Sequence, residues 1–256
     1  MKTKMKILST IAAIVALVLL SAVVFAVPEG PGKIVKGTPD RRVTGIDNGT
    51  GVLNQAQAGN MTSMNINSTR ISGRWQGYYG NITGVITLDD ASNNTLYSWD
   101  IASPQGEIYA VNDSKAVQWT QVICINMSDP NTNNVNVTLS ALENALGITN
   151  ANDKEGVNET FNQTFTGNFQ VGSSVTISKT SGCRAVSLNV NDAYDALNFN
   201  ETILTDNTSN HNVIYTAILE QQRAGFSGAS LDFEMIVGDN GDVTAATDYY
   251  FYVELT

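Results

Sequence analysis

The chain has 256 residues and a formal net charge of −10, yet charged residues make up only 15% of it. An acidic surface repels phosphate backbones and anionic lipid headgroups, so this composition argues against nucleic-acid binding. Asn, Thr, Ser and Gly supply most of the polarity, which suits loops and exposed strand faces.

Residues 1–26 have the features of a secretory signal peptide. Lys2, Lys4 and Lys6 give a basic start, an apolar run begins at Ile7, and the run ends in residues 21–26 (SAVVFA), with small or β-branched residues at positions −3 and −1 of a cleavage site after Ala26. Cleavage after Ala26 would leave 11 basic and 24 acidic residues, a net charge of −13. The alternative is an uncleaved anchor, since the apolar run is about as long as a bilayer-spanning helix. Membrane contact is expected only through this segment.

Export is supported independently by twelve Asn-x-Ser/Thr glycan acceptor motifs. With 28 Asn and 45 Ser plus Thr, chance spacing would give roughly five such motifs. A glycan needs an exposed Asn, so the motifs also predict the solvent side of the fold. The predicted acceptors are Asn48, Asn60, Asn67, Asn81, Asn93, Asn112, Asn126, Asn136, Asn158, Asn162, Asn200 and Asn207.

Residues 27–69 are predicted to form a polar N-terminal arm and linker. Three of the five prolines lie between residues 27 and 42, together with Lys33, Lys36, Arg41 and Arg42. One interpretation is a flexible basic tail. The other is that Lys33–Lys36 (KIVK) forms a short strand that completes the sheet of a neighbouring acidic subunit.

The stretch from Gly73 to Asn126 contains all three tryptophans, and its apolar residues recur at every second position. This alternation predicts four strands in an antiparallel meander at the centre of the core. In the first strand Ile82, Gly84, Ile86 and Leu88 share a face. The inward-facing residues of the later strands are predicted to be Tyr97, Trp99, Ile101, Val117, Trp119, Ile123 and Ile125.

One short helix is predicted from Ser140 to Gly147, with Ser140 and Glu143 as a capping box and Gly147 as its end. Further strands are predicted at residues 159–166, 175–180, 185–190, 201–205, 213–220, 231–237 and 249–255. Ten or more strands with one connecting helix indicate an all-β fold, an antiparallel β-sandwich of jelly-roll or immunoglobulin-like type. We expect a single such domain over residues 70–256.

Cys124 and Cys183 are the only cysteines. An exported chain is expected to pair them in a disulfide, and two unpaired buried thiols are the alternative. Structural zinc needs four ligands, so two cysteines and the sole histidine, His211, do not predict a zinc site.

No catalytic set is indicated, and the chain is expected not to be an enzyme. His211 lies in a polar loop without an orienting carboxylate, and residues 225–229 (GFSGA) lack the second glycine of a nucleophile elbow. Four acidic pairs are expected on solvated turns and exposed strand faces, although a secreted glycoside hydrolase would use two such carboxylates. Calcium at residues 239–242 (DNGD) is the one cofactor left open. The pairs are Asp89–Asp90, Asp192–Asp195, Asp232–Glu234 and Asp239–Asp242.

Aromatic residues allow two interpretations. Tyr78, Tyr79, Tyr250 and Tyr252 are candidates for stacking on a sugar or contacting a partner, or they belong to the core and its rim.

The signal, the density of acceptor motifs from Asn48 to Asn207 and the arm at residues 27–42 together resemble secreted archaeal-type envelope proteins. That class includes glycosylated filament subunits built from β-sandwiches that donate an N-terminal strand. The resemblance implies an exported cell-envelope or filament protein whose partners are like subunits or other cell-surface proteins. The alternative expectation is a carbohydrate-binding or adhesion module.

Overall fold

The computed structural model describes residues 27–40, 55, 57–61, 63–65, 71–101, 104–112, 117–125, 142–144, 146–148, 153–206, 212–240 and 246–255. Within these residues almost all of the regular elements are short strands. In chain order the elements are β1 (Trp75–Gly80), β2 (Gly84–Asp89), β3 (Thr95–Ile101), β4 (Gly106–Val111), the 3₁₀ turn η1 (Trp119–Gln121), β5 (Val122–Cys124), the helix α3 (Val157–Thr160), β6 (Gln163–Thr164), β7 (Asn168–Val171), β8 (Val175–Ser178), β9 (Arg184–Ser187), β10 (Asn189–Val190), β11 (Ala193–Tyr194), β12 (Asn200–Asp206), β13 (Val213–Ile218), β14 (Arg223–Ala224), β15 (Ser230–Leu231), β16 (Phe233–Gly238) and β17 (Tyr250–Leu255).

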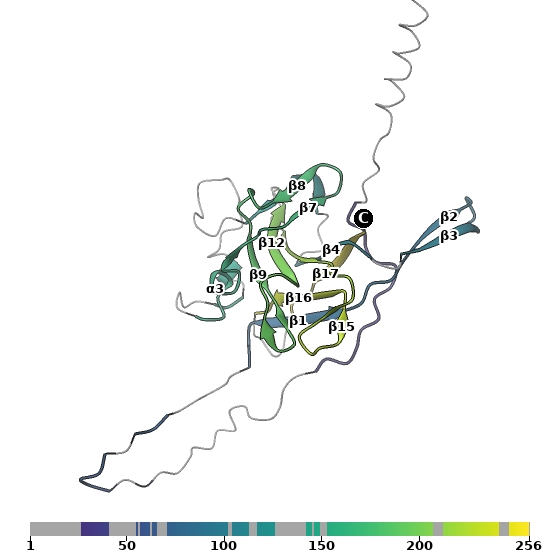
Figure 1. Ribbon diagram of the computed structural model, residues 1–256. Coiled ribbons are helices and arrows are strands. Elements are labelled where there is room, and N and C mark those ends of the chain that lie inside the picture. The colour runs from purple at the N-terminus through teal and green to yellow at the C-terminus, as the bar shows by residue number, and fades with distance from the viewer. Residues whose placement is uncertain are drawn as a thin grey trace, which may run out of the picture.

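One seven-stranded sheet forms the body of the protein (Figure 1). Its order is β17-β4-β13-β12-β9-β6, and β5 pairs with β12 on the same side as β9. The other described strands form two-stranded pairs, and every pairing is antiparallel. β17 is therefore an edge strand, with β4 on only one side of it.

Both faces of this sheet are covered, as the burial of β4 shows. Ile108 and Ala110 point into one apolar cluster, whereas Tyr109 and Val111 point into another on the opposite face. The pair β1–β16 contributes Met235 and Val237 to the first cluster, and β7–β8 contributes Phe169 and Ile177 to the second. The all-β, antiparallel, sandwich-like fold predicted from the sequence is confirmed.

The predicted disulfide between Cys124 and Cys183 is also confirmed. Cys124 ends β5 and Cys183 directly precedes β9, and both of these strands pair with β12. The bridge spans 59 residues of sequence, a loop for which chain entropy predicts a stabilisation of about 4 kcal/mol.

The helical segment after Ser140 is confirmed where it is described. Leu142–Asn144 is helical, the Leu146 amide donates to the Leu142 carbonyl at 3.1 Å, and Gly147 has a φ of +66°. Ser140 lies outside the described residues, so the capping box cannot be followed there. The Glu143 carboxylate accepts a hydrogen bond from the Val157 amide at 3.1 Å.

The strand predicted at residues 159–166 is wrong at its start, because Glu159 and Thr160 belong to the helix α3. Val157 and Phe161 are both fully buried, four positions apart, and the Glu143 carboxylate receives an amide at the start of α3. The Phe161 amide donates to the Val157 carbonyl at 2.8 Å, which is the i to i−4 hydrogen bond of a helical turn. The chain becomes extended only at β6.

The predicted four-stranded meander is wrong as well. Among the described strands, β2 and β3 pair only with each other, β4 pairs with β13 and β17, and β5 pairs with β12. Trp119 lies in η1 and packs against the second cluster, with Val117 and Ile125 buried and Ile123 half-buried. The apolar runs of β13 and β17 occupy both edges of β4, so the neighbouring strands in sequence find other partners.

Candidate interaction surfaces

The hairpin β2–β3 carries a large apolar surface that nothing in the described chain covers. Figure 1 shows it extending away from the sheet. The predicted inward positions of Tyr97 and Trp99 are therefore wrong, because these side chains are 59% and 49% exposed. Alternation identifies a strand with one apolar face, but it does not say that the same chain covers that face. Other exposed apolar residues of the hairpin are Val85, Ile86, Leu88 and Leu96.

Cross-strand packing and a tight turn hold the hairpin together. Ile86 lies opposite Trp99 and Leu88 opposite Tyr97, and the Tyr97 and Trp99 rings meet edge-to-face with centroids 4.8 Å apart. At the turn the Asp90 carboxylate accepts hydrogen bonds from the side chain and amide of Asn94 and from the Ser92 amide. These bonds lower the pKa of Asp90, that from the Asn94 side chain most. The turn fixes the register of β2 against β3.

The hairpin is acidic as well as apolar. Asp89, Asp90 and Asp100 lie between Gly84 and Ile101, and this range contains no Lys or Arg. Asp100 is exposed on β3, next to Trp99. A partner that matches this surface would offer apolar side chains flanked by basic ones.

The N-terminal arm is held to the sheet at its beginning and is exposed further on. Pro28 is buried, and Glu29 exchanges two backbone hydrogen bonds with Val253 on the open edge of β17, at 3.0 and 2.8 Å. Beyond this bridge Ile34 and Val35 are 51% and 80% exposed. The segment Lys33–Lys36 has no strand pairing in this single chain.

Pro31 explains why the arm forms only one bridge with β17. Continuing the antiparallel pairing by two residues would place Pro31 opposite Phe251. Proline has no amide hydrogen to donate to the Phe251 carbonyl, so the ladder cannot continue there. The arm is consequently free to leave the sheet after Gly30.

Two carboxyl groups lie side by side inside the sheet. Glu107 on β4 is paired in register with Glu254 on β17, and the two are 5% and 1% exposed. Burial, and then the nearby Glu254, raises the pKa of Glu107 to about 8. The Tyr109 hydroxyl and the Gly172 amide donate to the Glu254 carboxylate, but burial still raises the pKa of Glu254. Both groups are closed off from solvent, so a substrate in solution cannot reach them in this conformation.

Asp232 and Glu234 are buried, whereas the sequence predicted an exposed strand face. Asp232 accepts hydrogen bonds from the amides of Ile82 and Gln222, at 2.9 and 3.0 Å. Glu234 accepts one from the Phe226 amide at 2.6 Å, and burial raises its pKa. Neighbouring loops thus fold over the outer face of β16, and the carboxylates satisfy their amides. The segment 225–229 is a loop between β14 and β15, as predicted.

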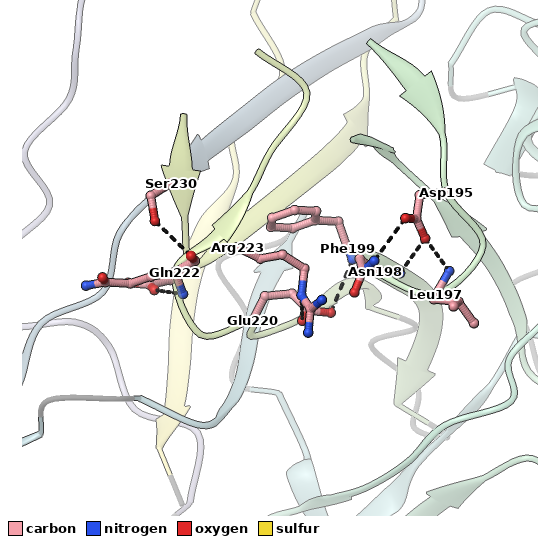
Figure 2. A network of polar contacts seen from close by, with 9 residues as sticks. Asp195, Leu197, Asn198, Phe199, Glu220, Gln222, Arg223 and Ser230 are labelled. Carbon is pink, nitrogen blue, oxygen red and sulfur yellow. Dashed lines mark hydrogen bonds and ion pairs between the residues drawn. The ribbon is translucent and has the colours of Figure 1, made fainter. Parts of the chain in front are cut away.

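Asp195 belongs to a polar network that organises the loop before β12 (Figure 2). Its carboxylate accepts hydrogen bonds from the amides of Leu197 and Asn198 and from the Asn198 side chain. These bonds lower the pKa of Asp195, with the Leu197 amide contributing most. In the same view Glu220 accepts from the Phe199 amide and from the Arg223 guanidinium at 3.0 Å. The structure of the loops explains all of these hydrogen bonds of Asp195 and Glu220.

The four tyrosines proposed as sugar or partner contacts differ in their surroundings. Tyr78 is half-buried and packs on Phe251, and Tyr252 is half-buried and packs on Trp119. Tyr79 is 58% exposed and Tyr250 is 42% exposed. Tyr97 and Trp99, which the sequence pattern predicted to lie in the core, form a more accessible aromatic surface than Tyr78 or Tyr252.

None of the described glycan acceptors is buried. Asn60, Asn81, Asn93, Asn112 and Asn162 are exposed, whereas Asn158 and Asn200 are half-buried. Asn93 lies in the hairpin turn with a φ of +63°. The acceptors outside the described residues are Asn48, Asn67, Asn126, Asn136 and Asn207.

Gly241 and Asp242 also lie outside the described residues, so the prediction of calcium at residues 239–242 stays untested. His211 is outside them as well. Among the residues that are described, no three or more His, Cys, Asp or Glu side chains are arranged to hold a metal ion. In the same part of the chain, no helix is long and apolar enough to cross a membrane. Comparisons of the chain with protein-family models, with curated proteins and with solved structures gave no significant match.

Proposed function

We propose that this chain is an exported, glycosylated structural subunit that associates with copies of itself in a cell envelope or extracellular filament, and that its N-terminal arm joins one subunit to the next. The observation that carries the proposal is the state of the arm. It is docked at Glu29 on an open sheet edge, released by Pro31, and then presents Ile34 and Val35 to solvent. An exposed strand-forming segment beside unpaired sheet edges favours association by strand addition.

Three further observations support export and assembly. The Cys124–Cys183 disulfide suits an oxidising compartment. The described acceptor asparagines are exposed or half-buried, as glycan attachment requires. The β2–β3 hairpin adds an uncovered apolar surface of the kind that marks protein contacts.

The test is to remove the arm from the exported protein. A variant lacking residues 28–42 should remain folded, with an unchanged disulfide and circular dichroism spectrum, and should elute as a monomer. The native protein should form oligomers or filaments in light scattering and negative-stain images.

A second, milder variant replaces Lys33–Lys36 with a Gly-Ser segment of equal length. This variant keeps the length of the arm but removes its strand-forming residues. It should behave as the deletion does, because Gly and Ser disfavour strands. Normal assembly of the arm-deleted variant would disprove the proposal.

A carbohydrate-binding or adhesion module is the second candidate, favoured by the exposure of Tyr79, Tyr250 and the hairpin pair Tyr97 and Trp99. Exposed aromatic rings can stack on sugars. Glycan-array binding by the native protein that is lost in Trp99→Ala or in Tyr79→Ala with Tyr250→Ala would support it. Binding that survives both changes would remove these residues as the site.

A further inference from the structure

We infer that the β3 edge of the β2–β3 hairpin is the acceptor site for the arm segment Lys33–Lys36 of a second copy of this chain. This inference rests on the proposed function and specifies where the arm binds. The occupant becomes the third strand of a sheet that has only two among the described residues of the single chain.

The hairpin lacks what an independently stable sheet needs. Two strands alone are marginally stable in water, and a third strand or packing against another element is normally required. Here both edges are unpaired by any described strand, and Leu96 and Trp99 on β3 are 81% and 49% exposed. A strand added at β3 would form hydrogen bonds with the free backbone groups of β3 and would shield the rings of Tyr97 and Trp99.

Charge complementarity favours the arm as the segment that binds at the hairpin. Residues 84–101 carry three Asp and no basic residue, so a second hairpin packed against this one would bring like charges together. Residues 33–36 carry two Lys around Ile34 and Val35. Lys33 and Lys36 are exposed and would project to opposite faces of an added strand, so one of them can pair with Asp100. The two apolar residues likewise face opposite sides of the hairpin.

The open edge of β17, where the arm begins, is less suited to receive the segment. Glu29 of the same chain already occupies the backbone groups of Val253, at the centre of that edge. The hairpin edge has no such occupant among the described residues. The arm therefore keeps its own start on β17 and offers its later residues to the next copy.

Site-directed cross-linking tests this placement in the full chain. Ile34→Cys and Val35→Cys are prepared separately, and each is mixed with Leu96→Cys under mild oxidation. Because Ile34 and Val35 project to opposite faces of a strand, one of the two should cross-link to Leu96→Cys at least tenfold more than the other. Leu197→Cys is the matched control, since Leu197 is 83% exposed and lies away from the hairpin in the loop before β12.

A charge exchange gives a second, independent measurement. Asp100→Lys should weaken association roughly two- to tenfold, as expected for losing and reversing an exposed ion pair. Combining it with Lys33→Glu and Lys36→Glu should restore association. Asp89→Lys, at the far end of the hairpin, should have a smaller effect.

The outcomes separate this inference from the proposed function. If arm deletion abolishes assembly but no mixture cross-links Leu96→Cys above the Leu197→Cys level, the acceptor is elsewhere and only this inference fails. If the arm-deleted protein assembles normally, the proposed function fails as well.

Discussion

The Glu107 carboxyl group on β4 is buried beside Glu254 on β17. Ionisation of Glu107 is unfavourable in these surroundings. Its pKa is raised from 4.5 to about 8 in the folded protein. The folded state therefore binds the proton more tightly than the unfolded chain between these values. The free energy of unfolding should fall as pH rises from about 4.5 to about 8, by on the order of 5 kcal/mol.

Urea unfolding at pH 5, 6.5 and 8 would measure this dependence. Glu107→Gln, which is uncharged throughout, should flatten the profile between pH 5 and 8. Asp100→Asn removes an exposed carboxylate and serves as the control, with a profile like that of the native protein. An unchanged slope in Glu107→Gln would show that Glu107 is not the titrating group.

The contacts of some individual residues could be predicted from the sequence, and the contacts of others could not. The disulfide followed from there being only two cysteines in an exported chain. The Glu107–Glu254 pair depends on register between strands far apart in sequence, which local patterns do not contain. A signal did exist, because each Glu stands in an otherwise apolar strand, GEIYAV or YFYVEL.

Individual elements differ in how much they contribute to stability. Trp99 on the hairpin is half-exposed, whereas Phe161 is fully buried and touches the rings of Trp75 and Tyr215. Phe161→Ala should lower the free energy of unfolding by about 3–5 kcal/mol, and Trp99→Ala by less than about 1 kcal/mol. Chemical denaturation of both variants measures the difference. Equal losses would mean that the hairpin packs on the body in solution.

The existence of most elements was predictable, but their surroundings were not. Alternation located β2, β3 and β17 and identified residues that share a face of the hairpin, but it wrongly predicted that Tyr97 and Trp99 point inward. It could not distinguish a face buried by the same chain, as on β17, from one left open, as on the hairpin. Nor could it show that loops cover Asp232 and Glu234, because only tertiary packing places those amides over β16.

For the whole molecule, association between a basic arm and an acidic hairpin should depend on salt. Raising ionic strength from about 0.05 M to about 0.5 M shortens the Debye length severalfold and screens exposed charges. Self-association should weaken accordingly, although the apolar contacts keep it from vanishing. Sedimentation at graded salt concentrations would measure this, and association that strengthens with salt would indicate purely apolar contacts.

The fold class could be predicted because short strand patterns, separated by turn residues, recur along the whole sequence. Strand order was not, since β4 takes its partners from β13 and β17, more than a hundred residues further on. The energetic preference of a doubly buried strand for apolar neighbours outweighs proximity in sequence.

The Cys124–Cys183 bridge also determines how the protein would respond to mechanical tension. Force transmitted through the arm and β17 can peel strands apart, but the 59-residue separation closed by the bridge cannot be extended. In single-molecule stretching the oxidised protein should unravel to a contour length about 200 Å shorter than the reduced protein. Equal lengths in the two states would show that the bridge does not carry load. A subunit built this way would keep part of its body shielded from tension after its edge strands had yielded.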